Sequence, residues 1–260
     1  MATHTAIITA EYNQFAEQYS QASEHLPSGR LEKAGVRAAL GDCTGLCILD
    51  LGGGTGLHVG TAIDAGASRV DVVDISEGML RVGKAKHASL DRVFWHIADV
   101  TQPLETQSLD ILPPGSYDVV MGNWVMDHAG TDEALRGIWR NISAFVKTGG
   151  RFVGVRQLAV GSVDARFVNG QRKYGAVASD FETVEGGIEY TVTILTDPPF
   201  SFKGSARDDS MGMINTIPGE VGFAELELLK LETTDVVRED PAFWADFLEA
   251  PHFGVAFGRK

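Results

Sequence analysis

The 260-residue chain has little cysteine, no long apolar run and no basic N-terminal stretch. Its two cysteines, Cys43 and Cys47, lack the second pair of ligands that a zinc site requires, and so few thiols are typical of a reducing compartment. No window approaches the length of a membrane span, and no basic region precedes an apolar core at the N-terminus. We therefore expect a soluble, cytoplasmic protein without a metal site.

Basic residues are also scarce. The chain has 22 Lys and Arg residues against 35 Asp and Glu residues, which gives a formal net charge of -13. A surface of this sign repels a phosphate backbone, so nucleic acid is not an expected partner. An uncharged or cationic small molecule suits it better than a polyanion. The oligomeric state, monomer or homodimer, stays open.

Short apolar runs alternate with helical patterns through the first 156 residues of a chain long enough for a full core. This alternation is typical of a parallel sheet covered by helices on both faces, an α/β doubly wound fold. Ser76 is the expected N-cap of one helix, and Thr131 begins another that ends at Gly149–Gly150. The expected strands are Leu46–Leu51, Arg69–Val73, Val93–Ile97, Tyr117–Gly122 and Arg151–Arg156.

The two ends of the chain follow other patterns. Residues 1–40 carry helical periodicity at Gln14–Tyr19 and Leu31–Leu40, and we expect them to form an N-terminal helical lid. Residues 157–207 contain a predicted hairpin that ends at Pro198–Pro199, and we expect them to form a cap insertion within a single domain of residues 1–260. The hairpin strands are Phe181–Thr183 and Ile188–Leu195, and the tail has a helix around Asp208–Phe223 and strands at Glu225–Leu231 and Gly254–Gly258.

The stretch LCILDLGGGTGLH, residues 46–58, places four glycines within five residues directly after an apolar strand. A strand that ends in such a turn and leads into a helix offers unpaired backbone N–H groups to a ligand. Nucleoside triphosphates, dinucleotides and S-adenosylmethionine are bound at such turns. Leu57 and His58 stand where a triphosphate loop needs lysine and Ser or Thr. Leu57 or Val59 stands where a dinucleotide loop needs its third glycine.

The loop does match the pattern D-x-G-x-G-x-G, through Asp50, Gly52, Gly54 and Gly56, with Gly53 inside it. It thereby resembles the first motif of the class I S-adenosylmethionine-dependent methyltransferases. A carboxylate at this strand end attracts a ligand that carries an ammonium and a sulfonium, whereas it repels a pyrophosphate. The resemblance implies a Rossmann-like, mostly parallel sheet of seven strands whose last strand is antiparallel.

Later segments resemble the same family in the expected order. VDVVDISEGML ends the second predicted strand with Asp74, which is suited to accept hydrogen bonds from both ribose hydroxyls of the cofactor. The segments HIADV, YDVVMGNWVMDHA and NISAFVKTGGRFVGV match further motifs, although Thr148 replaces the usual proline of the last one. The resemblance assigns the remaining cofactor contacts to Ile75, Met79, Asp99, Val100, Asn123 and Trp124.

Asp127 and His128 are the candidate catalytic residues, since they follow the fourth predicted strand. His128 can take a proton at neutral pH, which helps a hydroxyl acceptor but is not required by a neutral amine. His58 is expected to face helix packing or the carboxylate end of the cofactor.

The segment EYNQFAEQY resembles the tyrosine-bearing lid helix of small-molecule methyltransferases. That resemblance implies that Tyr12 or Tyr19 closes over the cofactor, and we expect Arg30 to pair with the cofactor carboxylate.

The segments NWVMDHA, ILTDPPFSF and DPAFWADFLEAPHFGVAFGRK resemble the toxoflavin N-methyltransferase-like subgroup. The implied function is methyl transfer to a nitrogen or oxygen of a small, secondary-metabolite-like acceptor, mainly by proximity and orientation. Carboxyl or hydroxyl methylation with His128 or Asp127 as base, a non-catalytic cofactor-binding regulatory protein and an NAD-dependent dehydrogenase remain as alternatives.

Overall fold

The computed structural model describes residues 4–158, 171–207 and 216–260. Its main sheet has seven strands in the order β3-β2-β1-β4-β5-β10-β9. The first five of these run parallel to one another, whereas β10 is antiparallel to both of its neighbours. The sheet confirms the predicted doubly wound fold with an antiparallel last strand. Its strands are β1 (Cys47–Leu51), β2 (Arg69–Asp74), β3 (Val93–Ile97), β4 (Tyr117–Met121), β5 (Val146–Gln157), β9 (Glu227–Leu228) and β10 (Phe253–Arg259).

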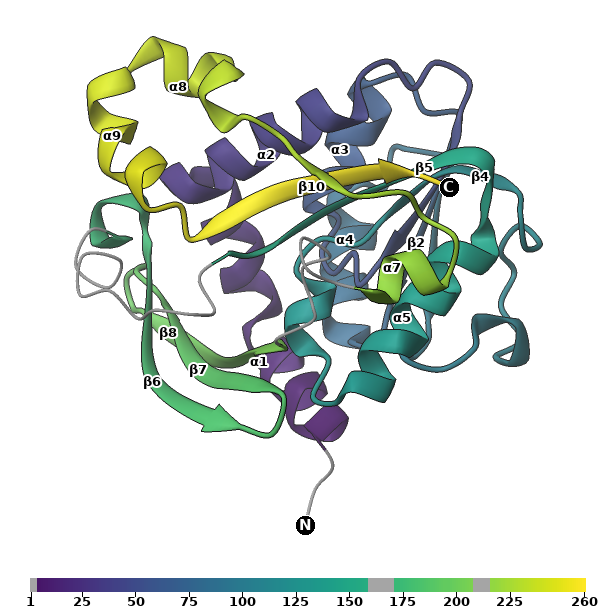
Figure 1. Ribbon diagram of the computed structural model, residues 1–260, viewed down its shortest axis with the longest axis horizontal. Coiled ribbons are helices and arrows are strands. Elements are labelled where there is room, and N and C mark those ends of the chain that lie inside the picture. Colours follow the sequence, from purple (N-terminus) through teal and green to yellow (C-terminus); the bar gives the residue numbers. More distant parts are fainter. Residues whose placement is uncertain (1–3, 159–170, 208–215) are drawn as a thin grey trace.

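Helices lie on both sides of the sheet (Figure 1). No helix in the described part of the chain is both long and apolar enough to cross a bilayer. The α-helices are α1 (His4–His25), α2 (Pro27–Leu40), α3 (Leu57–Asp64), α4 (Glu77–Lys86), α5 (Asp132–Phe145), α7 (Thr216–Glu220), α8 (Asp235–Glu239) and α9 (Pro241–Glu249). The 3-10 helices are η1 (Leu104–Thr106), η2 (Val125–His128), η3 (Gln171–Tyr174) and η4 (Leu231–Thr233).

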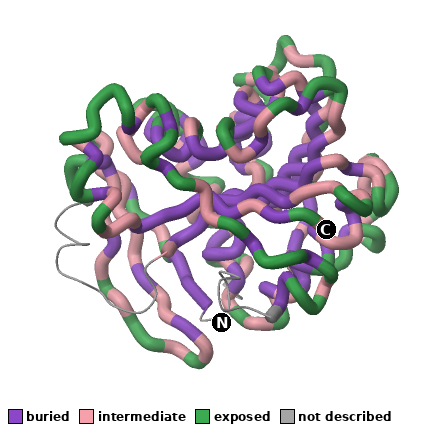
Figure 2. Tube along the Cα trace, turned by 45° about the horizontal axis from the view of Figure 1, so that its top comes forward, coloured by how far each residue is buried: buried purple, intermediate pink, exposed green. Residues whose placement is uncertain are grey.

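Neighbouring residues of each central strand pack into different cores, because successive side chains point to opposite faces. In β1, Ile48 joins the core that contains α2 and α3, whereas Leu49 joins the core that contains α5. Figure 2 shows the strands as a buried band through the middle of the molecule, with exposed turns around it. Burial of each such aliphatic side chain contributes roughly 1.5–3 kcal/mol to the stability of the folded state. Two stabilised faces therefore hold the strand ends in fixed positions.

Two predicted helix starts are confirmed. The Ser76 hydroxyl accepts a hydrogen bond from the Met79 backbone N–H at 3.1 Å, and the Thr131 hydroxyl accepts one from Ala134 at the same distance. The predicted end at Gly149–Gly150 is wrong, since α5 ends at Phe145 and β5 begins at Val146. The pairing of Val146 with Tyr117 draws this segment into the sheet, with an irregular register beside it.

A second, three-stranded antiparallel sheet, called the small sheet below, follows β5. It consists of β6 (Ala176–Val184), β7 (Gly187–Ile194) and β8 (Phe200–Arg207), in that spatial order. The predicted hairpin is confirmed as β6 and β7, but β8 was not predicted, because the two prolines before it suggest an end to the pairing. Its pairing resumes directly after them, with Phe200 opposite Ile194.

The tail is less regular than the sequence suggests. Residues 208–215 of the predicted helix lie outside the described residues, and α7 covers Thr216–Glu220 only. The predicted strand Glu225–Leu231 is reduced to the two residues of β9, whereas β10 extends the predicted strand Gly254–Gly258 by one residue at each end.

Helix α1 joins the small sheet to the main domain. The Asn13 side-chain oxygen accepts hydrogen bonds from the Ser76 hydroxyl at 2.9 Å and the Gly78 N–H at 2.7 Å. On the other side, Glu11 accepts one from the backbone N–H of Lys203 in β8 at 3.2 Å. Figure 1 shows α1 beside the small sheet. The helix therefore lies between the end of β2 and the small sheet.

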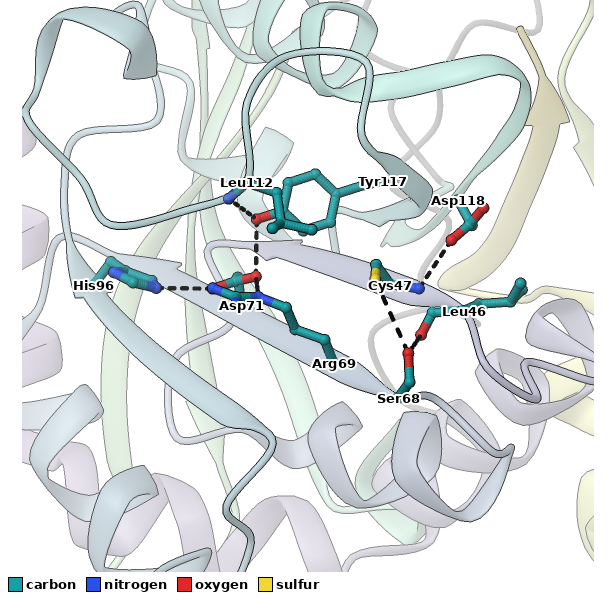
Figure 3. A network of polar contacts seen from close by, with 9 residues as sticks. All are labelled: Leu46, Cys47, Ser68, Arg69, Asp71, His96, Leu112, Tyr117 and Asp118. Carbon is teal, nitrogen blue, oxygen red and sulfur yellow. Dashed lines mark hydrogen bonds and ion pairs between the residues drawn. The ribbon is translucent and has the colours of Figure 1, made fainter.

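A buried carboxylate links three strands of the main sheet (Figure 3). Asp71 in β2 is fully buried and accepts two hydrogen bonds from Arg69, at 2.6 and 2.8 Å, and one from the Tyr117 hydroxyl at 2.8 Å. Nε2 of His96 lies 3.0 Å from Oδ1 of Asp71. Burial alone would raise the pKa of Asp71, but these partners lower it. The network fastens β2 to β3 and β4.

Candidate active site

The glycine loop connects β1 to α3 in a conformation that suits few other residues. Gly54 has φ of +54°, and a Cβ on Gly53 would lie 2.7 Å from Oδ2 of Asp50. The Gly54 N–H donates to Oδ2 of Asp74 at 2.8 Å, which joins the loop to the end of β2. The expectation of unpaired glycine N–H groups is wrong, because Gly52 and Gly53 also donate to the Val73 carbonyl and Gly56 donates to the Gly53 carbonyl. What the loop offers is a backbone without side chains, which a ligand can approach closely.

A first cavity lies at this edge of the sheet and encloses about 1010 Å³ of empty space, its open mouth included. It brings together most of the predicted cofactor residues, from α1, the loop, α4 and the ends of four strands. Those that line it are Tyr12, Tyr19, Asp50, Gly52, Gly53, Gly54, Asp74, Ile75, Met79, Asp99, Val100, Asn123 and Trp124.

Two predicted cofactor residues lie elsewhere. Gly56 is buried behind the loop, where its carbonyl oxygen is 3.0 Å from Nε2 of His87 and a Cβ would meet Trp95. Arg30 is exposed on α2 and does not line the cavity. The buried face of α2 includes Leu31, which turns the neighbouring Arg30 away from the core. The structure gives no support to a pairing of Arg30 with the cofactor carboxylate.

Asp50 presents an unpaired carboxylate oxygen beneath the glycine loop. Its side chain is 1% exposed and Oδ1 has no hydrogen-bond partner. Burial, opposed by His58 and aided by nearby Asp74, raises the pKa of Asp50 to about 7. A buried carboxyl without a donor is costly for the protein alone and favours a cationic ligand.

Asn123 shows the same lack of partners at the end of β4. It is 7% exposed, lines the first cavity, and neither its amide oxygen nor its amide nitrogen has a hydrogen-bond partner. Buried amides are normally paired, so an unpaired one in a cavity wall indicates a ligand contact.

Asp74 is held in place by backbone donors. Its Oδ2 accepts from Gly54, and Oδ1 accepts from the N–H of Ser76 at 2.8 Å. Burial raises its pKa while these bonds lower it. Each oxygen retains a lone pair for a further donor, as the ribose prediction requires. At Asp99, Oδ1 accepts twice from Thr101, so a contact to the adenine amino group would fall to Oδ2.

Trp124 adopts a left-handed backbone conformation, with φ of 61°. This region is rare for bulky residues and costs of order 1–3 kcal/mol. Its backbone N–H donates to the Val155 carbonyl oxygen at 2.7 Å, and its ring lies edge-on to Phe253 with a centroid separation of 5.8 Å. The strained backbone directs this indole between the first cavity and the space beyond it.

A second cavity adjoins the first and encloses about 880 Å³, its opening included. Five residues line both cavities: Tyr12, Tyr19, Glu32, Trp124 and His128. The further walls of the second cavity come from α2, the ends of β5 and β10, and the small sheet. These shared side chains border both cavities, so a ligand in one cavity would lie next to a ligand in the other.

The predicted catalytic pair divides into two environments. The Tyr12 hydroxyl lies 2.8 Å from Nε2 of His128, in the shared wall. Asp127 is 2% exposed, and its Oδ2 accepts from the N–H of Gln157 at 3.2 Å. Burial raises the pKa of Asp127 to about 6, although Arg156, 3.9 Å away, opposes the shift. Asp127 and His128 both line the second cavity, but only His128 also lines the first, whereas Asp127 binds the end of β5.

Several lining residues were not predicted. Glu32 is buried in α2 and its Oε1 lies 2.8 Å from Nε2 of His58, which itself lines the first cavity beside Asp50. Thr5 and Ile8 of α1 also line that cavity. One signal for Glu32 was present in the sequence, namely a glutamate on the otherwise apolar face of the predicted helix. Its contact with His58 on α3 is tertiary, so the sequence alone could not indicate it. Among residues 4–158, 171–207 and 216–260, no three His, Cys, Asp or Glu side chains gather as metal ligands.

Comparison with known proteins finds similarity over part of the chain. Residues 48–150 match the family model described as a methyltransferase domain. A demethylmenaquinone methyltransferase of Clavibacter sepedonicus is 32% identical over 149 residues, which are 56% of this chain and 56% of the relative. The match thus spans little more than half the length of that relative.

Solved structures extend the likeness to the whole fold. An S-adenosylmethionine-dependent methyltransferase of Mesorhizobium loti has a TM-score of 0.56 at 22% identity, over 86% of this chain and 95% of that one. A phosphoethanolamine N-methyltransferase of Haemonchus contortus, solved with phosphomonomethylethanolamine and S-adenosylhomocysteine, has a TM-score of 0.60 at 17% identity, over 100% of this chain and 60% of that one. Residues 48–150 are therefore similar to a methyltransferase domain, and the chain has the fold of these solved methyltransferases.

Proposed function

We propose that the whole chain is an S-adenosylmethionine-dependent methyltransferase that holds its cofactor in the first cavity and a small acceptor in the second. The observation that carries this proposal is the wall shared by the two cavities, formed by Tyr12, Tyr19, Glu32, Trp124 and His128. Methyl transfer needs the acceptor atom within about 3–3.5 Å of the methyl carbon, in a site from which water is excluded. Adjoining cavities supply such a site.

The polar groups of the first cavity fit the cofactor. When bound, S-adenosylmethionine supplies a methyl group on a cationic sulfur, which carries the reactivity. The unpaired oxygen of Asp50 suits the ammonium group, and the fixed carboxylate of Asp74 suits the ribose hydroxyls. Ile75, Met79 and Val100 offer apolar surface to the adenine. The unpaired amide of Asn123 suits a polar group near the shared wall.

The remaining elements orient the acceptor. We propose that residues 1–40 act as a lid, because Tyr12 and Tyr19 line both cavities from α1. The segment 157–207 then acts as a cap, because Tyr190 and Phe202 line the second cavity from the small sheet. Together they exclude water and position a nitrogen or oxygen of the acceptor, in keeping with the small heterocyclic substrates of the toxoflavin N-methyltransferase-like subgroup.

Transfer of a radiolabelled methyl group to a panel of small aromatic amines, heterocycles and phenols tests this function. Val192→Trp fills the second cavity, whereas Thr193→Trp, the next residue of β7, lies outside its lining and is the matched control. We expect both variants to bind S-adenosylhomocysteine like the wild type, and only Val192→Trp to lose methyl transfer. Full turnover by Val192→Trp would place the acceptor elsewhere. Cofactor binding without transfer to any acceptor would favour a regulatory protein.

A quinone is a second candidate acceptor. The relative from Clavibacter sepedonicus is by name a demethylmenaquinone methyltransferase. Apolar side chains in the second cavity, among them Leu26, Val192, Ile194 and Phe253, would suit such a ring. Addition of a reduced naphthoquinone to the acceptor panel tests this candidate directly.

A further inference from the structure

The second cavity has no permanently cationic side chain in its described lining to neutralise an anion. The described residues that line it include neither Lys nor Arg. Its carboxylates already have partners, since Glu32 lies 2.8 Å from His58 and Asp127 lies 3.9 Å from Arg156. Among these described walls, a negatively charged acceptor would therefore lose its hydration without gaining a Lys or Arg partner.

His252 does not alter this balance. It is 7% exposed and lines the second cavity close to Phe253. Burial lowers its pKa to about 3, so the imidazole stays uncharged at neutral pH. The described walls of the second cavity thus offer an anion no Lys, Arg or His252 charge.

Aromatic rings surround the part of the second cavity nearest the shared wall. Phe202 lies 5.4 Å from the Tyr12 ring and 6.2 Å from the Tyr19 ring, measured between centroids, and 6.4 Å from His128. Trp124 and Phe253 form another pair on its border. Flat rings at these separations favour a planar, apolar ligand over a flexible polar one.

The shared wall also carries a hydrogen-bonded route for a proton. Burial, with nearby Tyr19 and Asp74, raises the pKa of Tyr12 well above its ordinary value, so the phenol keeps its proton. The Tyr12 hydroxyl lies within hydrogen-bond distance of Nε2 of His128, at 2.8 Å, and its own oxygen can accept a hydrogen bond from another hydroxyl. A hydroxyl in the second cavity can thus reach His128 through Tyr12.

We propose that the second cavity selects an uncharged aromatic acceptor, and that a ring hydroxyl of this acceptor is methylated while its proton passes through Tyr12 to His128. The proposal rests on the function proposed above. The hydroxyl oxygen forms its bond to the methyl carbon as the sulfur–carbon bond breaks, and the sulfur keeps that electron pair. The acceptor proton moves to the Tyr12 oxygen, the Tyr12 proton moves to Nε2, and His128 ends as an imidazolium.

Three probes of one ring system test the selection without turnover. Calorimetry on the full-length protein, saturated with S-adenosylhomocysteine, gives the dissociation constants of 2-naphthol, 2-methoxynaphthalene and 2-naphthoate. We expect 2-naphthol to bind roughly three- to tenfold more tightly than its methyl ether, as one net hydrogen bond provides. We expect 2-naphthoate to bind at least about tenfold more weakly than 2-naphthol, because its charge has no partner.

Variants locate the hydrogen bond. Tyr12→Phe should bring the ratio of the naphthol and ether affinities to about one, since both probes share every other contact. Phe202→Leu is the control, because it should weaken both probes alike and leave the ratio unchanged. An equal affinity for 2-naphthol and its ether in the wild type, a tighter binding of 2-naphthoate, or an unchanged ratio in Tyr12→Phe would each overturn the proposal.

The outcomes separate this proposal from the one on which it rests. Failure of the wild type to bind S-adenosylhomocysteine refutes the proposed function itself. Binding of S-adenosylhomocysteine with no preference for 2-naphthol refutes only the acceptor class. The wild-type comparison needs no variant, so it decides the matter even if Tyr12→Phe does not fold.

Discussion

Replacement of Asp50 by asparagine removes the charge proposed to receive the cofactor's ammonium group and keeps the size of the side chain. In the wild type, burial raises the pKa of this carboxyl to about 7, from an ordinary 3.8. A shift of about 3 units corresponds to about 4 kcal/mol for ionising the group inside the folded protein. Asp50 is therefore mostly protonated at pH 6 and mostly ionised at pH 8.

The affinity for S-adenosylhomocysteine should follow this ionisation. A cationic ammonium binds the ionised carboxyl, which makes up about a tenth of the protein at pH 6 and about nine-tenths at pH 8. We expect the wild-type dissociation constant to be about tenfold larger at pH 6 than at pH 8. At pH 8, Asp50→Asn should bind S-adenosylhomocysteine more weakly than the wild type. Its dissociation constant should also change little between pH 6 and pH 8, apart from any change that the ionisation of Asp74 causes.

Stability should change in the opposite direction. The pKa of Asp50 is higher in the folded state than in the unfolded state, so the unfolded chain releases its proton first as the pH rises. The contribution of Asp50 to the free energy of unfolding therefore falls between about pH 4 and pH 7, by up to about 4 kcal/mol. Asp50→Asn should be the more stable protein in urea at pH 8.

Calorimetry at pH 6 and pH 8 and urea unfolding at pH 4 and pH 8 measure these effects. Equal affinities of the wild type at both pH values, together with an unchanged affinity in Asp50→Asn, would refute the role of Asp50 as the partner of a cation. If Asp50→Asn is less stable than the wild type at pH 8, the proposed cost of ionising buried Asp50 is refuted.

Variants at three other positions separate the cofactor contacts from the scaffold. Asp74→Ala should reduce the affinity for S-adenosylhomocysteine by about 100-fold, since it removes two ribose acceptors and leaves the Gly54 N–H unpaired; a wild-type value by calorimetry would place the ribose elsewhere. Trp124→Gly should relieve about 1 kcal/mol or more of backbone strain yet reduce methyl transfer, because the shared wall is opened; Trp124→Phe should keep both properties closer to the wild type. Tyr117→Phe should lower the free energy of unfolding by about 1–3 kcal/mol, by removing a donor from buried Asp71, with binding of S-adenosylhomocysteine unchanged.

The sequence predicts the parts of the site that depend on local signals. Asp50 and the glycines are close neighbours in the chain, and Ser76 caps a helix that begins at the next residue. Spacing along the chain therefore indicates where the loop and the α4 cap lie. The parallel sheet follows from alternating apolar runs, and it brings the carboxyl ends of β1, β2 and β4 to one edge.

Contacts between distant segments could not be predicted in the same way. Asn13 binds Ser76 across 63 positions, and Glu32 lies beside His58 through the packing of α2 on α3. The orientation of Arg30 depends on which face of α2 is buried. Strand β8 depends on pairing with β7, which overrides the two prolines that precede it. These features require the tertiary structure because each is decided by a partner far away in the chain.

Calorimetric titration of the wild-type protein with S-adenosylhomocysteine, beside a titration with NAD, tests the central claim most directly. A cofactor site built from Asp50, the glycine loop and Asp74 predicts saturable binding of S-adenosylhomocysteine and no binding of NAD. Saturable binding of NAD, with no heat from S-adenosylhomocysteine, would contradict the claim and favour a dehydrogenase.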